Sequence, residues 1–201
     1  MRPVRREEIL PLEVYERARD ELRRAILAAK APRRVHVGEH LTLLFENTAT
    51  IRYQVQEMAR AERMTKEEEI GHELATYNEL LGGRGELSAT LLIEITEQAD
   101  RDLKLRQWLG LQSHLYLALD DGTRVRARFD ARQVGEDRLS SVQYLKFDVQ
   151  GRVPVAAGSD LPALTLEAPL TAEQREALRQ DLASDAPTGG PPGAGPDRAL
   201  K

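Results

Sequence analysis

The chain contains no cysteine among its 201 residues and only nine aromatic side chains. Without thiols it forms no disulfide, holds no zinc or iron–sulfur cluster through cysteine, and uses no thiol in catalysis. Hydrophobic residues make up 41% of the chain and aromatic residues 4%, so aliphatic side chains must build the core. No apolar run of about 18 residues exists, and no secretory signal follows the basic start. We therefore expect a cytoplasmic protein without a membrane span.

The charges of the chain nearly balance, with 29 lysines and arginines against 33 aspartates and glutamates, a net charge of −4. This small excess argues against a nucleic-acid or membrane partner recognised through bulk charge. At roughly 150 residues per domain, the length predicts one domain. The last 18 residues hold four prolines and four glycines, too little apolar surface for ordering to be favourable. We predict a single domain over residues 1–183 and a disordered Pro/Gly-rich tail over residues 184–201.

Apolar residues recur at helical spacing in some segments and form short strand-like runs in others. Two capping boxes, Thr65 with Glu68 and Thr171 with Gln174, mark expected helix starts. Because helices and strands are mixed without strict alternation, we predict an α+β fold, with a mixed or antiparallel sheet and helices mainly on one face. The expected helices span 11–30, 49–63, 65–81, 97–109 and 171–183, and the expected strands span 33–46 with a break at Gly38, 87–95, 113–129 as a hairpin, 140–149 and 163–168.

The hairpin at 113–129 turns around Asp121-Gly122, and its loop length decides which side chains share a face. A two-residue loop would place its leucines on the same face as its arginines. A three-residue loop, which pairs Leu119 with Val125 and places Tyr116 opposite Arg128, makes one face apolar. We therefore expect the three-residue loop.

Four segments together carry a family resemblance: His-Leu-Thr-Leu-Leu-Phe-Glu at 40–46, Arg-Tyr-Gln-Val-Gln-Glu-Met at 52–58, Glu73-Leu74 with Tyr77-Asn78, and Ala-Thr-Leu-Leu-Ile-Glu at 89–94. In this order and spacing they resemble the bacterial family catalogued as domain of unknown function 3501. The resemblance extends from the N-terminal helix to about residue 183, and the Pro/Gly tail departs from it.

The resemblance implies a setting rather than an activity. The family has no assigned activity, so no catalytic residue is carried over. Genes of the family often lie near those for rubrerythrin-like proteins and for iron–sulfur proteins that are similar to heterodisulfide reductase. The resemblance therefore implies a cytoplasmic accessory or binding protein in peroxide or redox defence.

The densest polar cluster lies on the helix at 52–63. Tyr53, Glu57 and Arg60 follow at i, i+4 and i+7, so one helix face presents a phenol, a carboxylate and a guanidinium. Such a face could hold a partner loop or a small polar ligand. It could equally be a solvated face with a Glu57–Arg60 ion pair, or an internal polar network that locks this helix to the next. The candidate ligand- or partner-binding residues are Arg52, Tyr53, Gln54, Gln56, Glu57 and Arg60.

A weaker metal candidate follows on the next helix. Glu69 and His72 have the Glu-x-x-His spacing that di-metal carboxylate bundles use on each of two helices. Only one copy is present, so the pair also fits an exposed helix start, and we expect no bound cofactor. The first alternative function is therefore an enzyme or metalloprotein with a polar site around the helices at 53–73.

The second alternative function rests on Arg124, Arg126 and Arg128, which alternate along one expected strand. Their spacing of roughly 6.6 Å approximates that of successive phosphates, so they could bind an anion or a nucleic-acid backbone. Asp120 and Asp130 lie close enough in sequence to neutralise them. No phosphate-binding glycine loop, serine elbow or zinc-binding His-Glu-x-x-His motif is present in the sequence.

Overall fold

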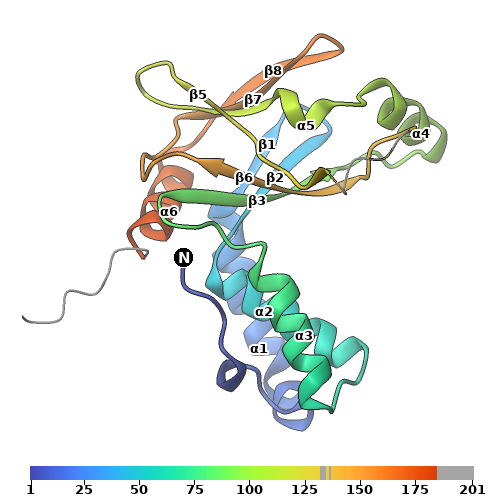
Figure 1. The fold of residues 1–201 in the computed structure, drawn as a ribbon, viewed down its shortest axis with the longest axis vertical. Coiled ribbons are helices and arrows are strands. Elements are labelled where there is room, and N and C mark those ends of the chain that lie inside the picture. Colours follow the sequence, from blue (N-terminus) through green and yellow to red (C-terminus); the bar gives the residue numbers. More distant parts are fainter. Residues whose placement is uncertain (132–134, 136, 185–201) are drawn as a thin grey trace, which may run out of the picture.

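The protein is described here by a computed structural model, which covers residues 1–131, 135 and 137–184. Within these residues the strands form two open antiparallel sheets, so the predicted α+β class is confirmed. One sheet, sheet A, lies between the other sheet, sheet B, and a projecting group of helices (Figure 1). Residues 185–201 of the predicted tail lie outside the described residues, and the division into one domain stays a prediction.

Sheet A consists of β1 (Arg34–Val37), β2 (Leu41–Glu46), β3 (Glu86–Ile93) and β6 (Val142–Asp148), paired in that order. Its inner face carries fully buried aliphatic side chains such as Leu43 and Leu91, which belong to the hydrophobic core. Its outer face carries Leu44, Thr90 and Tyr144 side by side across β2, β3 and β6. Because β2 is buried on both faces, the outer face of sheet A must also be partly covered.

Sheet B consists of β5 (Arg124–Arg126), β4 (Leu115–Ala118), β7 (Ala156–Leu161) and β8 (Leu164–Pro169), paired in that order. The sequence pattern does not indicate β7, because Ala-Ala-Gly-Ser-Asp-Leu has few residues with high strand propensity. In the structure β7 is placed between β4 and β8 and pairs with both. Tyr116 lies across Gly158, where a Cβ would be 2.6 Å from the tyrosine hydroxyl oxygen, so only glycine leaves room for the ring.

The hairpin between β4 and β5 confirms the loop length but not the pairing. The Leu119 N–H donates to the Thr123 carbonyl oxygen at 2.8 Å, which leaves three residues in the loop. The pairing is shifted by two residues from the prediction: Leu117 lies opposite Val125, and Tyr116 lies opposite Arg126 rather than Arg128. A shift of two keeps every side chain on its face, so hydrophobic pattern alone does not distinguish the two registers.

The helices confirm one of the two predicted capping boxes. Thr171 accepts from the Gln174 N–H and caps the last helix, whereas the helix at 67–78 begins after Lys66 without a side-chain cap, so the box at Thr65 is wrong. Asn47 caps the helix that follows β2. The helical bounds are η1 Arg6–Glu8, α1 Leu12–Lys30, η2 Ala31–Arg33, α2 Thr48–Ala61, α3 Glu67–Asn78, α4 Gln98–Gln107, α5 Leu111–His114 and α6 Ala172–Ala183.

The helices α1, α2 and α3 lie side by side and project from sheet A on the side away from sheet B (Figure 1). We call these three helices the arm. Helix α6 is held near the base of the arm by a buried ion pair. Asp181 of α6 accepts from Arg33 Nε at 2.7 Å and Nη2 at 2.9 Å, and from the Asn47 amide at 3.0 Å. The last helix is thus fixed to the residue that caps α2.

Candidate functional site

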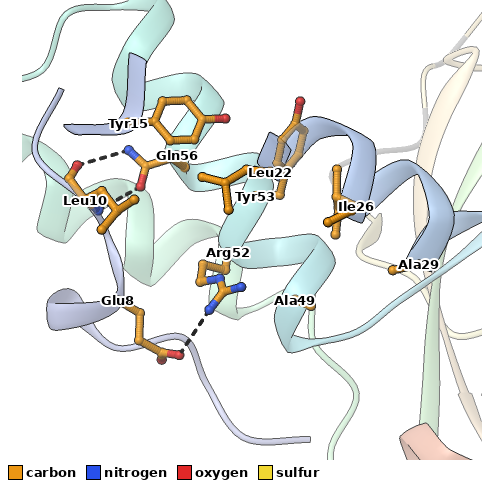
Figure 2. Close-up of a pocket in the computed structure, with 11 residues that line it drawn as sticks. Glu8, Leu10, Tyr15, Leu22, Ile26, Ala29, Ala49, Arg52, Tyr53 and Gln56 are labelled. Carbon is orange, nitrogen blue, oxygen red and sulfur yellow. Dashed lines mark hydrogen bonds and ion pairs between the residues drawn. The ribbon is translucent and has the colours of Figure 1, made fainter. Parts of the chain in front are cut away.

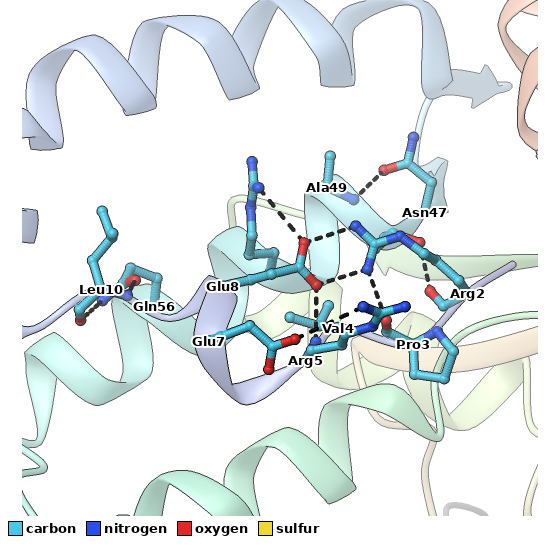
Figure 3. A network of polar contacts seen from close by, with 12 residues as sticks. Arg2, Pro3, Val4, Arg5, Glu7, Glu8, Leu10, Asn47, Ala49 and Gln56 are labelled. Carbon is cyan, nitrogen blue, oxygen red and sulfur yellow. Dashed lines mark hydrogen bonds and ion pairs between the residues drawn. The ribbon is translucent and has the colours of Figure 1, made fainter.

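Two side-chain amides hold the first residues of the chain against the arm. Gln56 of α2 accepts from the Leu10 N–H at 2.8 Å and donates to the Leu10 carbonyl oxygen at 3.1 Å (Figure 3). Asn78 of α3 makes the same pair of bonds to Val4, at 2.8 and 3.0 Å. Each amide satisfies a backbone donor and acceptor together, as a neighbouring strand would. We call residues 1–11 the N-terminal strap.

Ion pairs shape the strap further. Glu8 accepts two hydrogen bonds of 2.7 Å from Arg2 (Figure 3), and a guanidinium nitrogen of Arg52 lies 4.0 Å from a carboxylate oxygen of Glu8. The hydrogen bonds from Arg2 lower the pKa of Glu8 to about 2, against the opposing effect of burial. Arg6 pairs in the same two-bond manner with Glu67 of α3. The strap is therefore held along both α2 and α3.

A buried tyrosine, a carboxylate and a guanidinium join α1 to α2. Glu57 accepts from the Tyr15 hydroxyl at 2.5 Å and from Arg19 Nε and Nη2 at 2.8 Å each. Hydrogen bonds from Arg19 lower the pKa of Glu57, and burial followed by the bond to Glu57 raises the pKa of Tyr15. Both groups therefore keep their ordinary protonation states at neutral pH, unlike a general acid or base whose pKa lies near the working pH.

The predicted cluster of Tyr53, Glu57 and Arg60 does not form one site. Glu57 pairs with Arg19 rather than with Arg60, and Arg60 Nε lies 2.9 Å from Glu16 Oε1 in an ion pair without hydrogen-bond alignment. Together with the amide bonds of the strap, these contacts form an internal polar network, but it joins α2 to α1 and to the strap rather than to the next helix. Three candidate residues, Arg52, Tyr53 and Gln56, line a cavity.

This cavity lies between α1, α2 and the strap and has a volume of about 320 Å³ (Figure 2). Its size falls within the range of small-molecule sites, which are largely apolar with a few polar groups. The polar groups here come from Glu8, Tyr15, Arg52, Tyr53 and Gln56. The aliphatic lining comes from Leu10, Leu22, Ala25, Ile26, Ala29 and Ala49.

The charge at the edge of this cavity is positive. The side chain of Arg52 is 47% exposed, and its carboxylate contact at 4.0 Å is to Glu8, which already binds Arg2 at 2.7 Å. Arg2, Glu8 and Arg52 together carry a net positive charge, and the guanidinium of Arg52 has donors available for a further acceptor. The cavity therefore suits a molecule with an aliphatic body and an anionic end. We call it the Arg52 cavity.

The weaker metal candidates lie apart from this cavity. Glu69 is on the exposed side of α3 and pairs with Lys66 at 3.0 Å, and His72 is exposed one turn further. Among the residues that the structure describes, no three histidine, aspartate or glutamate side chains are grouped so that they could hold a metal ion. The remaining candidate, Gln54, lies on the side of α2 that faces sheet A.

The three strand arginines are each beside an acidic group. Arg126 pairs with Asp160 at 2.6 Å, and Arg124 lies 3.7 Å from Glu167. Arg128 lies beyond β5, where it binds Glu86 and its backbone pairs with sheet A. Local acids thus neutralise the guanidinium groups, which weakens the argument for a phosphate-binding row.

The fold and the cavity define an α+β protein with two open antiparallel sheets and a helical arm that encloses a small apolar pocket. The model of the family described as protein of unknown function (DUF3501) matches residues 3–182, and the chain belongs to that family. The predicted resemblance is thereby confirmed.

A crystal structure of a protein of unknown function from Burkholderia pseudomallei is similar to this chain. The two share 30% sequence identity and a TM-score of 0.82, over 90% of this chain and 100% of that one. A search of curated protein sequences finds no match. Among the described residues no helix is long and apolar enough to cross a membrane.

The sequence did not predict the N-terminal strap or the Arg52 cavity. The helical spacing over residues 11–30 predicts a helix but no cavity, because the opposite wall of the cavity comes from α2 and from the strap. Gln56 and Asn78 stand in two of the segments that carry the family resemblance. The family resemblance therefore draws attention to both residues, but it does not show that they bind backbone groups of the strap.

Proposed function

We propose that this protein is a binding protein whose arm holds a small aliphatic carboxylate in the Arg52 cavity. The observation that carries this proposal is an aliphatic cavity of about 320 Å³ with the half-exposed guanidinium of Arg52 at its edge. The aliphatic lining would take the ligand's chain, and Arg52 would donate to its carboxylate. The pKa directions of Glu57 and Tyr15 support binding rather than acid–base catalysis beside the cavity.

Calorimetric titration of the full chain with hexanoate and hexan-1-ol tests this proposal, because the two differ only in the anionic end. A charge-assisted hydrogen bond contributes about 1.5–3 kcal/mol, so we expect Arg52→Gln to weaken hexanoate binding about tenfold or more and to leave hexan-1-ol unchanged. Arg24→Gln is the matched control, since Arg24 is exposed on α1 and does not line the cavity. Equal hexanoate affinity in wild type and Arg52→Gln would refute the role of Arg52.

A second variant tests the cavity itself. Ala29→Leu places a larger side chain in the lining and should weaken both probes, because the added atoms occupy the space of the ligand's chain. No binding of either probe by the wild-type protein at millimolar concentration would overturn the proposal.

The proposal retains the setting that the family resemblance implies, a cytoplasmic accessory role in peroxide or redox defence. Affinity capture with the full chain tests that part separately. We expect rubrerythrin-like or iron–sulfur proteins among the captured partners, and their absence from repeated captures would remove the redox setting while leaving the Arg52 cavity as proposed.

A further inference from the structure

A second cavity, of about 220 Å³, lies where the arm meets the outer face of sheet A. Glu46 at the end of β2 and Thr90 of β3 line it from the sheet, and Tyr144 of β6 lies next to Thr90 across the sheet. Lys30 of α1, Gln54 of α2 and Tyr77 of α3 line it from the arm. We call this the Glu46 cavity. It is distinct from the Arg52 cavity, which no strand lines.

The buried carboxylate of Glu46 is the unusual group in this cavity. Glu46 is 8% exposed, and its two oxygens accept from the Thr50 hydroxyl at 2.5 Å and from the Thr90 hydroxyl at 2.7 Å. Among the described residues no basic side chain forms an ion pair with it. The N-terminal end of α2, which begins two residues later, supplies positive partial charge. Two hydroxyl bonds leave further acceptor positions of the carboxylate open.

Burying a carboxylate without an ion-pair partner is costly, because two hydroxyl hydrogen bonds and a helix N-terminus replace only part of its lost hydration. Glu46 also lines a cavity rather than the packed core. We infer that the Glu46 cavity binds a small organic ammonium compound, whose ammonium group donates to the Glu46 carboxylate.

The walls of the cavity fit such a group. Aromatic faces attract cations, and two tyrosines, Tyr77 and Tyr144, line the cavity beside Glu46. Tyr144 is 37% exposed and Val142 beside it 42%, so the cavity is accessible from solvent. Burial, with added effects of Tyr77 and Glu46, raises the pKa of Tyr144, so its hydroxyl keeps its proton at neutral pH.

Lys30 narrows the class of ligand. It lines the same cavity without pairing with Glu46, and its ammonium lies 5.6 Å from the centre of the Tyr53 ring. A diamine would bring a second positive charge close to Lys30, whereas a carboxylate would be attracted to it. The Gln54 side chain adds amide donors on the same side. The ligand class is therefore a small zwitterion of the amino-acid type.

Each of the four segments that carry the family resemblance contributes to this cavity. They supply Glu46, Gln54, Tyr77 and Thr90 in turn. These residues are up to 44 positions apart, as the bond between Thr90 and Glu46 shows. The fold thus brings together in one cavity four segments that the sequence analysis singled out separately.

Calorimetric titration of the full chain with L-valine, isobutylamine and isobutanol tests the inference. All three probes have a branched aliphatic body. L-valine carries an ammonium and a carboxylate, isobutylamine carries the ammonium alone, and isobutanol carries no charge. We expect L-valine to bind most tightly, isobutylamine more weakly and isobutanol not at all. Glu46→Gln should weaken the binding of L-valine at least tenfold. Lys30→Met should weaken the binding of L-valine but not the binding of isobutylamine.

Glu94→Gln is the matched control, because Glu94 also accepts from a threonine hydroxyl, that of Thr42 on β2, but does not line the cavity. It should bind L-valine like the wild type. Should Glu46→Gln not fold, as judged by circular dichroism, Tyr144→Ala provides the second test. It removes a partly exposed side chain from the wall of the cavity and should weaken the binding of isobutylamine severalfold.

The failure of this inference is distinguishable from that of the proposed function. Hexanoate binding that depends on Arg52 should be unchanged in Glu46→Gln, and L-valine binding should be unchanged in Arg52→Gln. The inference is overturned if neither L-valine nor isobutylamine binds the wild-type protein, or if Glu46→Gln binds L-valine as tightly as Glu94→Gln does.

Discussion

Replacing Gln56 by alanine tests whether the N-terminal strap is a stabilising part of the fold. Gln56 is 5% exposed, and its amide makes both hydrogen bonds to the backbone of Leu10. A typical intramolecular hydrogen bond contributes about 0.5–1.5 kcal/mol net. Losing two of them should lower the free energy of unfolding by about 1–3 kcal/mol. For a domain of this size, that corresponds to a fall in Tm of about 2–12 °C.

Urea unfolding followed by circular dichroism measures this change, and differential scanning calorimetry checks it. Gln54→Ala is the control, because Gln54 is on the same helix and makes no hydrogen bond with the other described residues. It should change stability by no more than about 0.5 kcal/mol.

Limited trypsin digestion adds a local readout for the strap. Cleavage after Arg5 or Arg6 should become faster in Gln56→Ala but not in Gln54→Ala, because the strap leaves the arm more often. Equal stabilities of the two variants would refute the conclusion that the amide of Gln56 holds the strap.

Three further outcomes can be measured. Gly158→Ala should lower the free energy of unfolding by about 1–3 kcal/mol in urea titrations, because the new methyl group would overlap the Tyr116 hydroxyl oxygen. Asp181→Asn should cost about 3–5 kcal/mol by the same measurement, because it leaves the guanidinium of Arg33 buried without a counter-ion. Glu8 has a folded-state pKa of about 2, below its ordinary value of 4.5, so it stabilises the protein above pH 4.5 and loses that effect as the pH falls towards 2. Unfolding free energies of Glu8→Gln should therefore decline less steeply over that range, and an unchanged slope would contradict the assigned ion pair.

Much of the fold can be predicted from local patterns. The helical spacing in residues 11–30 predicts α1 nearly to the residue, and Pro11 lies one position before the helix. The break at Gly38 is a left-handed turn with φ of +71°, which separates β1 from β2. These features depend on neighbours in sequence, so sequence reasoning identifies them.

Features that depend on distant segments could not be predicted in the same way. The register of the β4–β5 hairpin depends on where β5 leaves sheet B, and Arg128 pairs with Lys146 in the other sheet. β7 forms between β4 and β8, and its Gly158 leaves room for the ring of Tyr116, a contact that the composition of β7 does not reveal.

The candidate site can also be predicted only where it depends on residues close together in the sequence. The polar helix at 52–63 is identified from its sequence, and Arg52 and Tyr53 do line a cavity. Gln56 lines the same cavity but its amide binds the strap, and Glu57 pairs with α1. The sequence could not decide between a binding face and an internal network. Glu46 lies in a segment that carries the family resemblance, but the sequence does not indicate its cavity, because that cavity is assembled from both the arm and sheet A.

The contacts of Asp181 on α6 with Arg33 and Asn47 have a consequence for protein synthesis. Asp181 is 148 residues after Arg33 and 134 residues after Asn47. A nascent chain on the ribosome therefore exposes Arg33 long before its counter-ion has been translated. The guanidinium cannot take its buried position until α6 has left the exit tunnel. We expect nascent chains that stop before residue 181 to remain open at the base of the arm.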